Sequence, residues 1–238
     1  MKKLLSIFLS LTIILSTAAV FFVSASAASK TGKKYVSYKT VNKTIKKQGV
    51  LILKGKIQYP VLKSKSNAAK KVNKKIKNNV KKYADNIISM AKNDYSANGV
   101  TNFTRTGWHY EYKVTAKLTY NANGKYSYRI SYYGYTMGAH GNETVAGLTY
   151  KKSNGKKLSN AKTTKYSGSE LKEKIVNKME KVINNEPTKY YTTALEGIKN
   201  LDVNKFNIWL KGKYVYVHFN PYEIASYAAG PTEVKIKL

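Results

Sequence analysis

The chain has 238 residues, with 43 lysines and arginines against 12 acidic residues and no cysteine. The absence of cysteine excludes disulfides, thiolate metal sites and cysteine nucleophiles, so apolar packing must supply the stability. Only Arg105 and Arg129 are arginines, although the formal charge is +31. Because lysine acts as a mobile point charge, this excess favours a diffuse anionic polymer over nucleic acid; solubility alone also accounts for it.

Residues 1–27 have the features of a secretory signal. Two lysines precede an apolar run at residues 4–23, and Ala25-Ser26-Ala27 has the A-x-A form of a cleavage site. The run is also nearly long enough for an uncleaved membrane anchor. The small residues that follow it favour cleavage. We therefore expect a secreted protein, extracellular or associated with the cell wall, without a stable membrane span.

The next segments are predicted to be an arm, a strand and a long helix. Residues 28–48 are polar and rich in lysine, which is typical of a flexible arm. Val50–Tyr59 has the pattern of a strand. Apolar residues at three- and four-residue spacing predict a helix over Ser66–Asn93, with Ser66 as its N-cap.

The opposite face of this predicted helix is basic. Its lysines are Lys71, Lys74, Lys75, Lys81 and Lys82. A charged stripe of this kind is commonly a solvated helix face. It also suits binding of an anionic wall polymer such as teichoic acid, or of anionic lipid.

The middle of the chain predicts consecutive strands. Residues Trp108–Tyr120 alternate apolar and polar side chains, which is the pattern of a strand with one buried face. Asn123-Gly124 predicts a hairpin turn into a strand at Tyr126–Tyr135. A third strand is predicted at about Glu143–Lys152.

The last third predicts a helix followed by a small set of strands. The helix covers about Ser169–Asn184, and residues 190–200 form a further short helix. A hairpin joins Phe206–Leu210 to Tyr214–Phe219, and Glu233–Leu238 is the final strand. The fold class is therefore α+β, with a mostly antiparallel sheet and one long and one shorter helix on one face. Residues 49–238 form this region, as one unit or as subdomains at about 49–136 and 137–238.

The sequence contains no specific catalytic or metal-binding pattern. The three histidines, His109, His140 and His218, are far apart, and none belongs to a zinc-binding motif. His140 lies in a glycine-flanked loop, where it hydrogen-bonds the backbone, contacts a ligand, or serves as the general base of a hydrolase or deacetylase. No nucleophile motif accompanies it. We expect no enzymatic activity, no cofactor and no metal, and export argues against a nucleic acid partner.

Two segments dense in glycine, proline and tyrosine predict a binding surface. Tyr133–Gly141 reads YGYTMGAHG and Phe219–Gly230 reads FNPYEIASYAAG, and each follows a strand-like run. Loops between strands are where binding residues concentrate, and tyrosine offers a large contact area with a polar tip. We expect the two loops to meet at one end of a helix-backed sheet.

These segments resemble the extracellular domain of RsiV-type anti-sigma factors, which sense lysozyme, and the non-catalytic N-terminal region of PdaC-type peptidoglycan deacetylases. Residues 136–141 are similar to the TGGAHG loop of that family, and residues 220–230 to its NPYEIAPYAAG segment, with Ser226 in place of the second proline. The resemblance implies binding of lysozyme or another wall-active protein, with contacts from Ser131, Tyr133, Pro221 and Tyr222. The remaining expected ligand contacts, from the same two segments, are Tyr135, His140, Asn220, Glu223 and Tyr227.

Overall fold

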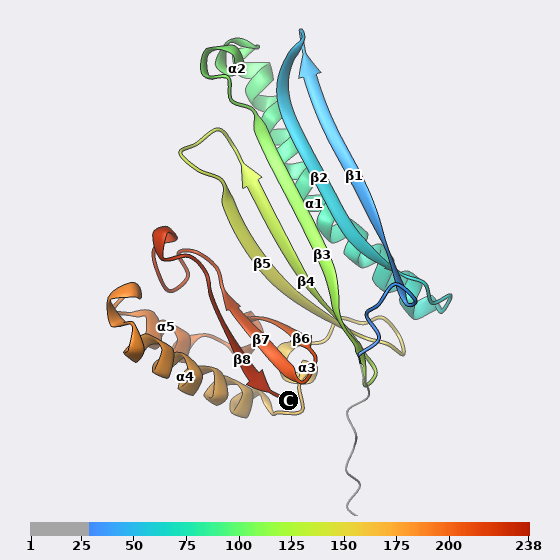
Figure 1. Cartoon of the computed structure of the whole chain (residues 1–238), viewed down its shortest axis with the longest axis vertical. Coiled ribbons are helices and arrows are strands. Elements are labelled where there is room, and N and C mark those ends of the chain that lie inside the picture. The colour runs from blue at the N-terminus through green and yellow to red at the C-terminus, as the bar shows by residue number, and fades with distance from the viewer. Residues whose placement is uncertain (1–28) are drawn as a thin grey trace, which may run out of the picture.

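The strands divide between two sheets, each covered by its own helices (Figure 1). The computed structural model describes residues 29–238, so the predicted signal at residues 1–27 lies outside the described residues. The first lobe has the strand order β1-β2-β3-β4-β5 and the second β6-β7-β8. β2 and β3 pair in parallel, whereas the other neighbours are antiparallel. The predicted α+β class is confirmed, and the two predicted helices cover separate sheets rather than one.

The first sheet consists of β1 (Val36–Lys47), β2 (Val50–Leu62), β3 (Tyr110–Ala122), β4 (Lys125–Tyr135) and β5 (Asn142–Lys151). The second consists of β6 (Asn207–Lys211), β7 (Tyr214–Phe219) and β8 (Thr232–Lys237). The helices are α1 (Asn67–Asn98), α2 (Thr101–Thr106), α3 (Asn160–Thr163), α4 (Gly168–Asn185) and α5 (Ala194–Asn200). Short 3-10 turns are η1 (Pro187–Lys189), η2 (Val203–Lys205) and η3 (Tyr227–Ala229).

Helix α1 forms where its apolar stripe predicts it. Val72, Ile76 and Val80 are buried against the first sheet. The Ser66 side chain accepts a hydrogen bond from the Ala69 N–H at 3.2 Å, as expected of an N-cap. Among the described residues, none of the helices is long and apolar enough to cross a membrane.

The alternation along β3 is confirmed from Tyr110 onward. Tyr112 and Val114 are buried in the core under α1, while Lys113 and Lys117 are exposed on the opposite face. The strand begins after Trp108, which is 49% exposed. Its predicted start at Trp108 is wrong, because Gly107, in the left-handed region, ends α2 just before it.

The prediction of a flexible arm at residues 28–48 needs correction. Val36–Lys47 forms β1, which pairs along its length with β2. Gln48 and Gly49 have φ of 50° and 79°, the left-handed backbone that a two-residue hairpin turn requires. Lysines at an edge strand discourage pairing with a further chain, so the same residues that suggested disorder suit an edge.

The second lobe begins after β5. Because β5 pairs with β4, the lobes separate after Lys151 and not near residue 137. Helix α4 starts at a capping box between Ser167 and Glu170, and it buries Leu171 and Met179 against the second sheet.

A close backbone approach joins the lobes. A Cβ at Gly147 of β5 would lie 1.7 Å from the carbonyl oxygen of Ile208 in β6, so only glycine fits there. The Leu210 N–H donates to Ser127 Oγ at 2.9 Å, and Ser127 shares a 2.8 Å hydrogen bond with Thr149. These buried polar contacts hold β6 against the face of the first sheet opposite α1.

Candidate functional site

The two tyrosine-bearing loops meet at the boundary between the lobes. His140, in the connection from β4 to β5, stacks on Tyr227 with ring centroids 4.0 Å apart. The Tyr227 hydroxyl donates to the Gly141 carbonyl at 2.7 Å. The prediction that these loops meet is therefore confirmed.

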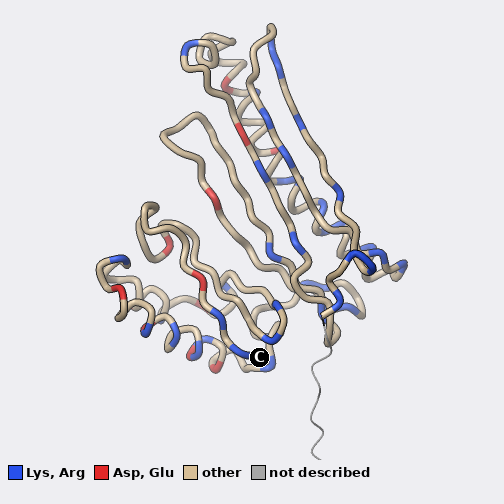
Figure 2. Tube along the Cα trace, viewed as in Figure 1, with Lys and Arg blue, Asp and Glu red and all other residues tan. Residues whose placement is uncertain are grey.

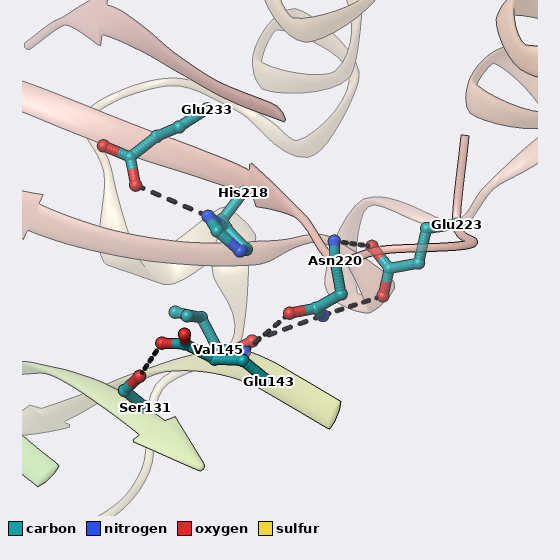
Figure 3. Close-up of polar contacts among 7 residues, drawn as sticks. All are labelled: Ser131, Glu143, Val145, His218, Asn220, Glu223 and Glu233. Atoms are coloured by element: carbon teal, nitrogen blue, oxygen red, sulfur yellow. Dashed lines mark hydrogen bonds and ion pairs between the residues drawn. The ribbon is translucent and has the colours of Figure 1, made fainter. Parts of the chain in front are cut away.

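Asn220 ties the β7–β8 connection to the edge of the first sheet (Figure 3). Its Oδ1 accepts from the Val145 N–H of β5 at 2.6 Å. Its Nδ2 donates to Glu223 Oε1 at 2.9 Å, and its own N–H donates to Glu223 Oε2 at 2.8 Å. Both residues were expected to touch a ligand; the contacts they make here position the loop and satisfy an edge-strand N–H.

This anchored loop presents Tyr222. The residue is 57% exposed and has φ of 68°, which is uncommon for a residue other than glycine. Its N–H donates to the Ala225 carbonyl at 3.0 Å, and its ring lies 5.7 Å from that of Tyr227. A strained backbone held by hydrogen bonds is typical of a site that must present one side chain.

Ser131, Tyr133 and Tyr135 lie on the face of β4 opposite α1, since the intervening residues face the core. The Ser131 hydroxyl donates to Glu143 Oε1 (Figure 3). The Tyr133 ring lies against Gly141, where an added Cβ would be 2.4 Å from it. Tyr135 instead makes an edge contact with Trp108, with ring centroids 6.5 Å apart.

The five predicted polymer-binding lysines lie elsewhere. Lys71, Lys74, Lys75, Lys81 and Lys82 are exposed on α1, which covers the opposite face of the first sheet. Lys75 donates to the Gly155 carbonyl at 3.0 Å, and Lys81 pairs with Asp85 at 2.6 Å. The helix lysines and the loops therefore form separate surfaces on opposite sides of that sheet.

His218 is a buried titratable residue that the motif search did not select. Its Nδ1 lies 3.4 Å from Glu233 Oε2 on the neighbouring strand (Figure 3). Burial lowers the pKa of His218, and Arg129 adds to this, while Glu233 opposes it. The alternation of β7 could have identified His218. Val215 and Val217 face the core of the second lobe, so His218 lies on the opposite face, towards the first lobe.

Metal-ligating side chains do not gather in the part of the chain that the structure describes. His109, just before β3, has its Nε2 2.9 Å from Glu111 Oε1. No group of three or more His, Asp or Glu side chains suitable for a metal occurs within residues 29–238.

The two sheets and the joined loops define a two-lobed α+β domain. Residues 46–143 match the family model described as "Deacetylase PdaC", and residues 162–238 match that described as "Protein of unknown function (DUF3298)". The predicted likeness to PdaC is thereby supported, and the boundary between the lobes falls in the gap between the two matches. The likeness to RsiV-type anti-sigma factors stays a prediction.

One solved structure shares the fold. A DUF3298 family member from Bacteroides fragilis is similar with a TM-score of 0.56 and 21% identity, over 85% of this chain and 89% of its own. A DUF3298 family protein from Pseudomonas aeruginosa has a TM-score of 0.49 and 14% identity, over 85% of this chain and 90% of its own. No curated protein matches the chain.

Proposed function

We propose that this is a non-enzymatic binding protein that is secreted and acts at the bacterial cell wall. Its specific contact is the loop surface, which consists of Tyr133, His140, Pro221, Tyr222 and Tyr227. The partner is lysozyme or another wall-active protein. The observation that carries the proposal is the exposed Tyr222, presented by a loop that the Asn220–Glu223 hydrogen bonds hold in place.

Tyrosine is enriched among the residues that dominate protein interfaces, because it buries a large area for little lost side-chain entropy. A loop that is already ordered before binding loses less freedom when it docks. Glu143 and Glu223 lie exposed beside the loop surface. These two carboxylates provide local complementarity to a basic partner such as lysozyme, although the whole chain is basic.

The lysines of α1 add a second, diffuse contact. They are exposed, and Figure 2 shows basic residues along this helix and along the strands of the first sheet, with few acids among them. Such a surface attracts an anionic wall polymer without fixed geometry. Binding to wall fragments that contain teichoic acid should fall as salt rises, because exposed charges are screened. Salt-independent binding would contradict this part of the proposal.

Titration of the mature protein against lysozyme at fixed salt tests the loop surface. Tyr222→Ala should weaken binding by about tenfold or more, the loss typical of a central interface tyrosine. Tyr38→Ala is the matched control, because Tyr38 is similarly exposed, at 46%, but lies on the edge strand β1. Equal affinities of the two variants would refute docking through the loops.

A digest of purified peptidoglycan separates binding from catalysis. The competing hydrolase or deacetylase hypothesis places His140 at the centre, and it predicts released or modified muropeptides that disappear in His140→Ala. The contacts of His140 are a stack on Tyr227 and a 3.1 Å approach of Nδ1 to the Gly141 carbonyl. Product formation by the purified protein would overturn the non-enzymatic proposal.

A further inference from the structure

A groove runs between the lobes on the face of the first sheet opposite α1. It consists of three hollows that share lining residues, and Arg129 lines all three. The larger two have volumes of about 660 and 740 Å³. We call it the inter-lobe groove and define it by Lys56, Lys113, Lys117, Arg129, Trp209 and Tyr216. Its open, extended form suits a chain better than a compact small molecule.

Like charges lie directly opposite each other on the floor of this groove. Lys56 is the cross-strand partner of Lys113, and Lys117 is the partner of Arg129. Such pairs destabilise a sheet. The acids lining these hollows are Glu143, which accepts a hydrogen bond from Ser131, and Glu233, which lies 3.4 Å from His218. An anion bound along the floor would offset this repulsion.

The two cationic pairs are separated along the strands. Lys113 and Lys117 lie four residues apart on β3, which corresponds to about 13 Å. Thr115 lies between them on the same face and offers a hydroxyl. The floor therefore alternates positive charge with neutral hydrogen-bonding groups, which fits a polymer whose charged groups are spaced by hydroxyl-bearing units.

Arg129 adds a planar guanidinium group, which can make two parallel hydrogen bonds where lysine cannot. It is one of two arginines among 43 basic residues. Its guanidinium lies 5.5 Å from the ring of Trp209, which stacks on Tyr216 with ring centroids 5.8 Å apart. Among the described residues no carboxylate forms an ion pair with it. A planar fork held against an indole, without an acid partner, is suited to bidentate contact with phosphate.

We propose that the inter-lobe groove binds a linear phosphodiester polymer with polyol or sugar units. Arg129 donates to one phosphate, the lysines of the floor neutralise its neighbours, and hydroxyl groups of the polymer meet Thr115 and Ser131. This inference deepens the proposed wall association and rests on it for the kind of polymer. It assigns specific recognition to the groove, whereas α1 attracts only by diffuse charge. The groove adjoins the loop surface, but Tyr222 does not line it.

Charge-conserving variants test the geometry. The probe is a labelled polyglycerol phosphate chain, titrated with the mature protein at fixed salt. Arg129→Lys should weaken binding by about tenfold, because a charged hydrogen-bonded contact loses its bidentate form. Arg105→Lys is the matched control on the exposed end of α2 and should stay within about twofold. Neither variant changes net charge, so diffuse attraction stays the same.

Charge-removing pairs give an independent readout. Lys113→Gln/Lys117→Gln and Lys71→Gln/Lys74→Gln remove the same charge from the groove and from α1. The groove pair should weaken binding by about tenfold more than the helix pair, since it removes direct phosphate contacts. If Arg129→Lys fails to fold, the Lys113→Gln/Lys117→Gln variant still tests polymer binding in the groove, because both lysines are exposed.

Several results would overturn the inference. Equal losses from the two lysine pairs would show that only net charge matters. Tighter binding of polyglutamate or of a single-stranded oligodeoxynucleotide with matched charge would exclude the proposed polymer. Tyr222→Ala should leave polymer affinity unchanged. If the wild-type protein binds the polymer but not lysozyme, the loop proposal alone fails. If it binds lysozyme but not the polymer, the groove inference alone fails.

Discussion

Gly147→Ala should weaken the packing of the two lobes against each other. The added Cβ would lie 1.7 Å from the Ile208 carbonyl oxygen, whereas ordinary contacts begin at 3.4 Å. Because both groups are backbone, no side chain can move aside, and β6 must shift by about 1.7 Å. The buried N–H groups of Leu210 and Val145, now bonded across the lobes, would lose their partners. At about 1–3 kcal/mol for each buried unsatisfied group, the expected destabilisation is about 3 kcal/mol.

Urea unfolding followed by tyrosine and tryptophan fluorescence measures this loss. Gly197→Ala is the control, because a Cβ at that position in α5 meets no atom within 4 Å. It should be neutral or stabilising by about 0.5–1 kcal/mol, since alanine favours helix over glycine. If the free energy of unfolding of Gly147→Ala lies within about 0.5 kcal/mol of the wild-type value, the close approach of β5 and β6 does not hold the lobes together.

Three further perturbations probe the same architecture. Burial lowers the pKa of His218 from its usual 6.5, so its contribution to stability is present above pH 6.5 and declines as pH falls; His218→Gln should flatten a plot of urea midpoint against pH in that range. Ser167→Ala removes the N-cap of α4 and should cost about 1 kcal/mol, measured by thermal unfolding. Asn220→Ala leaves an edge N–H without its partner; it should cost about 1–3 kcal/mol and increase hydrogen exchange in β5.

The sequence predicts those parts of the fold in which a single periodicity dominates. The three- and four-residue spacing of Val72, Ile76 and Val80 places α1 correctly, and the alternation from Tyr110 onward places β3. β1 was missed for a physical reason. An edge strand buries little, and its lysines give it the composition of a disordered arm, so the informative signal was the Gln48-Gly49 turn.

The candidate site is only partly predictable for a different reason. The loop motifs contain their own turn-forming residues, so Tyr222 and Tyr227 could be selected from sequence, and the structure brings their loops together. Arg129 and His218 carry no local motif. Their surroundings exist only once the second sheet lies against the first, as the contact of Arg129 with Trp209 shows. Residues from distant strands define such a site. The alternation of β7 predicts which face His218 occupies, but it does not predict the partners of His218.

Both candidate surfaces depend on how the lobes pack, and neither is complete in one lobe. The loop surface combines His140 from the first lobe with Tyr227 from the second, and the inter-lobe groove combines Arg129 with Trp209. Arg129 lines the hollow that also contains Pro221 and Tyr227, so the groove leads to the loop surface. A polymer phosphate at Arg129 would reduce the positive potential next to the loops. The same occupancy that holds the protein at the wall would thus favour the approach of a basic partner, which is how a basic protein can bind one.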